Sequence, residues 1–195
     1  LVSLFARAMY SYDSRYMISA SVRRDGSSRF ADGHRYGTFP SASVGWNIMN
    51  EPFFESAKGT VNELKVRASY GVLGNLNGIG EYQTQSTIKD GYNYVQGGSW
   101  WIGQITNTEW VTPPETTWEK TKTTNIGLDA ALLNNRFSVT ADYFVQKTDG
   151  LLMNVNQAPS AGLGGSPVMN AALVENKGVE LSLNHRNTVG EFYYA

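Results

Sequence analysis

The chain has 195 residues, of which 41% are hydrophobic, so a wholly disordered tail is excluded. Sixteen basic residues nearly balance seventeen acidic ones, and a net charge of −1 gives no electrostatic reason to expect a nucleic-acid partner. Cysteine is absent, which excludes disulfides, thiolate chemistry and zinc sites built on cysteine.

Alternating apolar and mixed positions predict strands from the first residues onward. Residues 2–12 place Val, Leu, Ala and Tyr on one face and a mixed set on the other. Residues 16–23 repeat this pattern after the turn at 13–15, so the two segments predict a hairpin. The alternation recurs over 36–49 and, without interruption, over 63–73.

The C-terminal half predicts three more strands and the start of an eighth. The three strands cover residues 117–132, 137–146 and 174–188, and the eighth begins at Glu191. No uncharged apolar run approaches the roughly 18 residues that a spanning helix needs. Because residue 1 is Leu1 and no signal peptide is visible, we expect an internal fragment of a longer protein.

The connections between these strands separate by length. In an up-and-down meander every second connection falls on the same side of the sheet. One side carries the short joins 13–15, 133–135 and about 187–190, with 50–62 as its longer exception. The other side carries the long connections 24–35, 74–116 and 149–172. Outer-membrane barrels have short periplasmic turns and longer extracellular loops, whereas a soluble sandwich has no reason to sort its loops.

These patterns predict an all-β, antiparallel, up-and-down transmembrane β-barrel segment of about eight strands. Its apolar face would meet lipid and its mixed face would line a wet lumen. Aromatic residues near strand ends on the apolar face would form an interfacial girdle: Tyr10, Tyr12, Tyr16, Tyr36 and Trp46. The alternative is a soluble carbohydrate-binding β-sandwich whose core uses the same apolar faces, and periodicity alone leaves it open.

Two sets of residues are candidates for contact with a ligand or partner. Aromatic rings in the longest loop could stack on sugars or meet another protein: Tyr92, Tyr94, Trp100, Trp101 and Trp110. Charged residues on the predicted lumen face could touch substrate: Lys65, Arg67, Glu119, Asp129, Asp142 and Glu180. The alternatives are a loop that packs on itself and charges that only solvate a wall.

Nothing in the sequence indicates catalysis, a metal or a cofactor. His34 and His185 lack the paired spacing of a metal site. The glycines around Ile79 lack the rest of a nucleotide-binding fingerprint. The sequence spacing of Glu115 and Glu119 does not fix the separation that a glycosidase requires. We therefore predict no catalytic, metal or cofactor-binding residues and a protein that is not an enzyme.

Several sequence strings resemble, in the same order, the SusC/RagA family of TonB-linked (TonB-dependent) outer-membrane transporters. They are VRRDGSSRF at 22–30, RYGTFPSASVGW at 35–46, LKVRASYG at 64–71, WEKT at 118–121, NIGLD at 125–129, NRF at 135–137, DYF at 142–144, TDGLL at 148–152 and NKGVEL at 176–181. The resemblance covers nearly the whole chain and is weakest over 81–111.

The resemblance, and not the spacing of residues, implies a segment of a 22-stranded barrel in the outer membrane of a Gram-negative bacterium. It implies nutrient uptake of glycans or, in some members, peptides, energised through TonB with a SusD-like lipoprotein as an outer cap. Residues 1–195 would then be a partial barrel domain without the N-terminal plug that carries the TonB contact.

Overall fold

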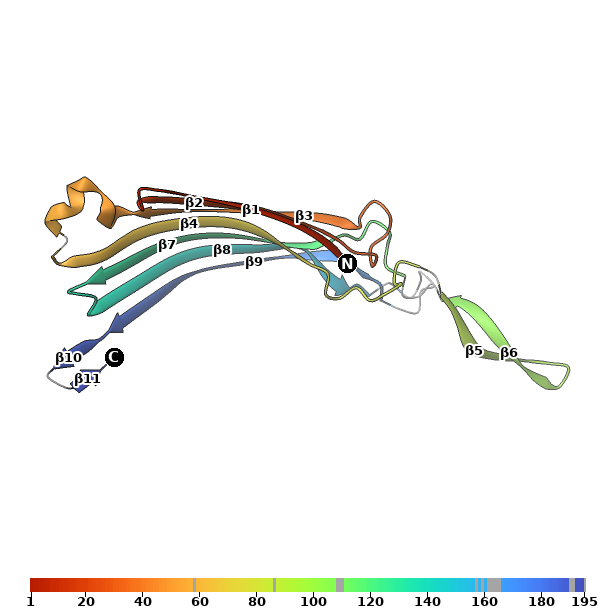
Figure 1. Ribbon diagram of the computed structural model, residues 1–195. Coiled ribbons are helices and arrows are strands. Elements are labelled where there is room, and N and C mark those ends of the chain that lie inside the picture. The colour runs from red at the N-terminus through yellow and green to blue at the C-terminus, as the bar shows by residue number, and fades with distance from the viewer. Residues whose placement is uncertain are drawn as a thin grey trace.

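The protein is described here by a computed structural model that covers residues 1–57, 59–85, 87–107, 111–156, 158, 160, 166–189 and 192–194. Seven strands form one antiparallel sheet in the order β1-β2-β3-β4-β7-β8-β9 (Figure 1). Their bounds are β1 Val2–Tyr12, β2 Tyr16–Gly26, β3 Tyr36–Asn47, β4 Val61–Asn75, β7 Glu119–Leu132, β8 Phe137–Asn154 and β9 Val168–His185. The prediction of an all-β, antiparallel meander is confirmed, and the sheet is open, with β1 and β9 as its edges.

The expected eighth strand does not join this sheet in the described residues. Strand β11 (Phe192–Tyr194) pairs instead with β10 (Asn187–Val189) in a separate two-stranded hairpin. The predicted long connection over 149–172 is also shorter than expected, because residues at both of its ends belong to strands. Strands β8 and β9 pair as far as Asn154 and Val168, and a bulge near Gly150 shifts the register, which breaks the alternation that sequence reading depends on.

The longest connection contains a hairpin that the sequence reading treated as loop. Strands β5 (Thr87–Gln96) and β6 (Ser99–Asn107) pair around Gly97 and Gly98, whose φ angles of 62° and 80° suit a two-residue turn. Figure 1 shows this hairpin projecting beyond the long-loop end of the sheet. The opposite end carries the turns at 13–15 and 133–136 and the 3-10 helices η1 (Ile48–Asn50) and η2 (Pro52–Ala57).

One face of the sheet is apolar and open. Its members are more than a third exposed: Leu4, Tyr10, Tyr12, Ile18, Val22, Val44, Tyr70, Ile126, Leu128, Tyr143, Val179, Leu181 and Leu183. A sandwich would bury these side chains under a second sheet, and in the described part of the chain no second sheet covers them. The sandwich alternative is therefore not favoured. Among the described residues, no helix has the length and apolar character needed to span a membrane.

A buried carboxylate fixes the short-turn end of the apolar face. Glu51, between η1 and η2, accepts hydrogen bonds from Tyr16 Oη at 2.6 Å and Trp46 Nε1 at 3.0 Å, and Arg15 lies 3.7 Å away. The Tyr16 and Trp46 rings stack at 6.5 Å between centroids, as expected of neighbouring girdle residues. The hydrogen bond from Tyr16, then that from Trp46, lowers the pKa of Glu51 below its ordinary value.

This arrangement makes part of the stability pH dependent. Since the pKa of Glu51 is lower in the folded state, its stabilising effect is complete above the ordinary carboxyl pKa and is lost as pH falls through the lowered value. We expect Glu51→Gln to lower the thermal midpoint at pH 7 and to reduce the drop in midpoint between pH 6 and pH 3. Glu63→Gln, at an exposed carboxylate on β4, is the control and is expected to leave both values unchanged. A Glu51→Gln profile parallel to that of the wild type would contradict this role.

Candidate functional site

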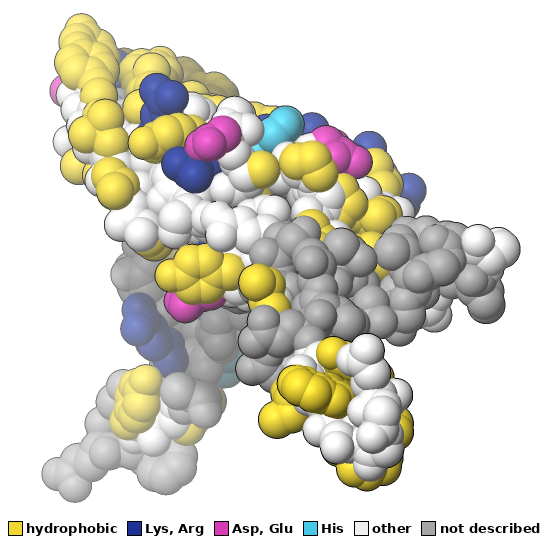
Figure 2. Space-filling view, turned by 90° about the vertical axis from the view of Figure 1, so that its right-hand side faces the viewer, with side chains coloured by type: hydrophobic (Ala, Val, Ile, Leu, Met, Phe, Trp, Pro, Cys, Tyr) yellow, Lys and Arg dark blue, Asp and Glu magenta, His cyan; other side chains and the backbone are white. Residues whose placement is uncertain are grey.

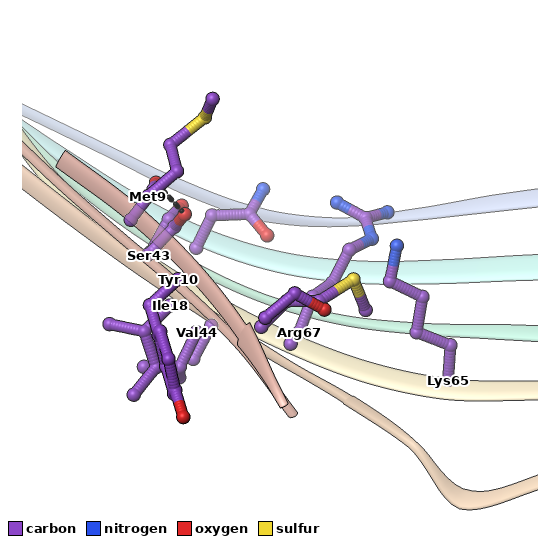
Figure 3. Close-up of a pocket in the computed structure, with 14 residues that line it drawn as sticks. Met9, Tyr10, Ile18, Ser43, Val44, Lys65 and Arg67 are labelled. Atoms are coloured by element: carbon purple, nitrogen blue, oxygen red, sulfur yellow. Dashed lines mark hydrogen bonds between the residues drawn. The ribbon is translucent and has the colours of Figure 1, made fainter. Parts of the chain in front are cut away.

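The polar face of the sheet carries a hollow of about 620 Å³. Its side chains on this face come from five neighbouring strands, and the main contributors are Met9, Met17, Ser43, Lys65, Arg67 and Asn125. Figure 3 shows Met9, Lys65 and Arg67 on one side of the sheet and Tyr10, Ile18 and Val44 pointing to the opposite side. The hollow thus lies on the mixed face of the sheet. Ser, Gly and Asn residues form its base, and Lys65 and Arg67 lie at its rim.

Three of the predicted lumen residues form one ionic network beside this hollow. Arg67 on β4 donates from Nε to Asp129 Oδ2 at 3.0 Å and from Nη2 to Asp142 Oδ2 at 2.7 Å. Thr140 Oγ1 donates to the other oxygen of Asp129 at 3.2 Å. One guanidinium therefore bridges β4, β7 and β8, which is the planar, two-carboxylate geometry that suits arginine better than lysine.

A glycine makes this bridge possible. Gly127 on β7 lies opposite Arg67 on one side and Asp142 on the other, so the guanidinium crosses directly over it. A Cβ at Gly127 would lie 2.5 Å from Asp142 Oδ1 and 2.7 Å from Arg67 Cζ. A side chain at this position must therefore displace the charged groups. The string NIGLD thus supplies both the gap and, in Asp129, one of the two carboxylates.

Glu119 differs from the wall residue that the sequence suggested. It is only 6% exposed, and both of its oxygens are occupied within the chain. Asn75 Nδ2 donates to Oε1 and the backbone N–H of Leu152 donates to Oε2, both at 3.1 Å. The carboxylate therefore ties β4 and β8 to β7 and has no free face for a ligand.

Removing one acceptor of Glu119 is expected to weaken this junction. Glu119→Gln would turn an NH₂ group toward one of the two donors, at a cost of about 1–3 kcal/mol. We expect a lower urea midpoint for the full-length protein, read from the loss of tryptophan fluorescence of the folded state. Glu180→Gln is the matched control, because Glu180 is exposed on the same face and has no ion pair among the described residues. Equal midpoints for the two variants would refute the structural role of Glu119.

The remaining two predicted lumen residues stand apart from the network. Lys65 is half-buried and lines the hollow, and Glu180 on β9 is exposed opposite Asp142. Neither forms an ion pair in the described part of the chain. Of the six predicted residues, the structure thus brings together three, buries one in a junction and leaves two on the open wall.

The long-loop end is held by a buried cluster that the sequence reading did not identify. Its members come from three connections and the strands beside them: Phe30, Phe39, Val72, Ile79, Trp118, Leu152 and Val168. Trp118 lies 5.2 Å from Phe30 and 5.5 Å from Phe39 between ring centroids, and its Nε1 donates to the Arg35 carbonyl at 3.2 Å. Strands β3 and β4 stop pairing at Ser41 and Gly71, and the Phe39 ring fills the space beyond them.

The arginines of the charged turn between β2 and β3, and of the end of β2, have partners within the protein. Arg29 donates to the Ile79 carbonyl at 3.1 Å, Arg35 pairs with Asp32 at 3.0 Å, and Arg23 pairs with Asp25 at 2.8 Å. Arg29 thus joins this turn to the connection after β4, whereas Arg35 pairs within the turn and Arg23 pairs within β2. The turn therefore contributes to the packing of the loop end through Arg29.

The aromatic loop residues lie on the β5–β6 hairpin. Trp100 is 77% exposed, Trp101 53% and Tyr94 52%, with Tyr94 directly opposite Trp101. Figure 2 looks onto the loop end and shows hydrophobic side chains gathered on the hairpin that projects toward the viewer. The backbone of Tyr92 pairs with Gly103, but its side chain and all of Trp110 lie outside the described residues. The described rings are available for contact with another molecule and do not pack into a loop core.

Comparison with known proteins gives a consistent result. The family model described as "TonB dependent receptor-like, beta-barrel" matches residues 2–195. The chain is 38% identical over 183 residues to "TonB-dependent receptor P39" of Formosa agariphila, and 34% identical over 192 residues to "TonB-dependent receptor SusC" of Bacteroides thetaiotaomicron. These alignments cover 94% and 97% of the chain but only 17% and 19% of the relatives.

Solved structures agree with the sequence relatives. The chain superposes on a structure of the "RagAB peptide importer" with a TM-score of 0.84 and 32% identity, covering 97% of this chain and 20% of that one. The siderophore receptor PirA of Pseudomonas aeruginosa matches with a TM-score of 0.57 at 15% identity, which supports the fold alone. The similarity to SusC and RagA that the motifs suggested is confirmed.

Proposed function

Because the chain belongs to the TonB-dependent receptor-like β-barrel family, we propose that it forms a wall section of a transporter in the outer membrane of a Gram-negative bacterium. The observation that carries this proposal is the exposed apolar face opposite a polar face with a bridged ionic network. A membrane barrel needs both faces, one for lipid and one for a wet lumen. Residues 1–195 are then a part of the barrel domain.

The different lengths of the connections at the two ends of the sheet support an orientation for this wall. The short turns and η1–η2 would face the periplasm, and the cluster around Trp118 with the β5–β6 hairpin would face outward. The Tyr16 and Trp46 pair would lie at the periplasmic interface. The long strands β8 and β9 would extend the outer end of the wall above the lipid.

The transported class is a glycan or a peptide. The "peptide importer" title of the RagAB structure and the SusC relative support this class, together with the polar face and the aromatic hairpin. We further propose that a SusD-like lipoprotein covers the outer end and that TonB energises uptake through a plug region of the complete protein. The transporter would move its substrate without chemical change, and Tyr94, Trp100 and Trp101 would contact that substrate or the partner lipoprotein.

Growth and uptake test the proposal directly. A strain that lacks the gene is expected to lose growth on one glycan or peptide mixture as sole nutrient, and the full-length gene is expected to restore it. The restored growth should disappear again when TonB is removed. Growth of the deletion strain on every mixture tested, or uptake that persists without TonB, would overturn the transport function.

A further inference from the structure

Toward the long-loop end of β7, β8 and β9, the apolar face of the sheet carries lysines in place of apolar residues. Strand alternation places Lys120 and Lys122 on the same face of β7 as Ile126 and Leu128. Lys147 on β8 and Lys177 on β9 share that face, because Lys147 lies directly opposite Lys122 and Lys177 lies opposite Val145. Lys122, Lys147 and Lys177 are exposed.

Two of the four lysines are paired with carboxylates, so the group keeps a net positive charge. Lys147 Nζ lies 2.8 Å from Glu175 Oε2, and Lys122 Nζ lies 3.7 Å from Asp149 Oδ2. Lys120 and Lys177 form no ion pair among the described residues. Four lysines against two carboxylates leave a positive patch, and the two pairs hold Lys122 and Lys147 beside their neighbours across the strands.

The height of the patch matches the edge of the lipid. Ten residues separate Leu132, at the short-turn end of β7, from Lys122. At about 3.3 Å per residue and a strand tilt near 40°, this is about 25 Å along the membrane normal. The apolar band of an outer-membrane barrel is also about 25 Å tall. The lysines therefore begin where the acyl chains of the outer leaflet end and the headgroups start.

From this placement we infer that Lys120, Lys122, Lys147 and Lys177 form a binding site for the phosphate groups of an anionic glycolipid in the outer leaflet. The acyl chains of the same lipid would lie on the adjoining apolar residues Ile126, Tyr143 and Val179, so the site continues the lipid-facing surface. Lysine is a point-charge donor that suits phosphate oxygens, and lipid phosphates are the anions present at this height. The inference rests on the proposed placement in the outer membrane and adds a specific lipid to it.

Native mass spectrometry of the full-length transporter in detergent tests the site. The probes are bis-phosphorylated lipid A and the same lipid after removal of both phosphates. Wild-type protein is expected to prefer the phosphorylated form, and each lysine removed should weaken that preference about fivefold. The variants are K122Q and the triple variant K120Q/K122Q/K177Q, with K65Q on the opposite face as the charge-matched control. Folding is checked by heat-modifiable mobility.

The outcomes separate this inference from the proposed function. Loss of the preference in the triple variant, a smaller loss in K122Q and none in K65Q would support the site. Equal binding of both lipids by wild-type protein, or an unchanged preference in a folded K122Q, would overturn the site and leave the barrel proposal intact. Binding of neither lipid would overturn the site and would also leave the barrel proposal intact. Displacement of lipid A by millimolar inorganic phosphate would show a free-anion site and would contradict the lipid assignment.

Discussion

Replacing Trp118 by alanine is expected to loosen the entire outer end of the wall. The indole is 3% exposed, contacts Phe30 and Phe39, and donates to the Arg35 carbonyl. Loss of a buried aromatic side chain of this kind costs about 3–5 kcal/mol. Because the cluster joins residues from three connections, the cost should appear as local opening there before the membrane strands unfold.

Hydrogen exchange by mass spectrometry measures this effect in the full-length protein. Protection is expected to fall over residues 27–35 and 76–79 and to persist over 16–22 in β2. Trp101→Ala is the matched control, because Trp101 is 53% exposed on the hairpin and its removal should change stability by less than about 0.5 kcal/mol. Uniform protection in Trp118→Ala would mean that the outer loops do not depend on the cluster.

Removing the guanidinium of Arg67 is expected to destabilise the middle of the wall. Arg67→Met leaves Asp129 and Asp142 without their shared cation, and the Asp142 side chain is only 12% exposed. Because the Arg67 side chain is 35% exposed, water partly solvates the two carboxylates after the change. We therefore expect the free energy of unfolding to fall by about 2 kcal/mol. In a urea titration of the protein in micelles, this change should appear as a lower urea concentration at the midpoint of unfolding.

Gly127→Ala tests the same bridge from the backbone side. The added Cβ meets the tips of Arg67 and Asp142 and should force the guanidinium out of place. The two changes should therefore be strongly non-additive in a double-mutant cycle. Gly71→Ala is the control, because a Cβ there lies 3.5 Å from Ser41 Cβ, which is ordinary contact. Full additivity of R67M and G127A, or equal effects of G71A and G127A, would contradict the bridge.

Sequence reading recovered the sheet because each of its long strands has one apolar face and one mixed, polar face. Period-two alternation over 2–12 or 63–73 records that difference directly. It failed on β5 and β6 because exposed Trp100 and Trp101 lie on opposite faces, which leaves no alternation to detect. The hairpin signal that remained was Gly97-Gly98, a turn dipeptide between two aromatic runs.

The site was predictable only in part, because the residues that form it are far apart in the sequence. The alternation along each strand placed Arg67, Asp129 and Asp142 on the same face. Their contact could not be predicted, because the two aspartates lie 62 and 75 residues from Arg67 in the sequence. It also requires the space left by Gly127 between them. Glu119 has the same parity, yet Asn75 and Leu152 occupy both of its oxygens. A strand pattern assigns a face, whereas the strand register decides which residues on that face become neighbours.

The orientation of the wall is tested most directly by epitope accessibility on intact cells. A short tag is inserted in the full-length protein either between Gly97 and Gly98, at the tip of the β5–β6 hairpin, or between Asn134 and Asn135, in a short turn. We expect antibody to reach the hairpin tag on intact cells and to reach the turn tag only after the outer membrane is permeabilised. Labelling of the turn tag on intact cells, with the hairpin tag protected, would contradict the assignment of faces and ends on which this account of the protein depends.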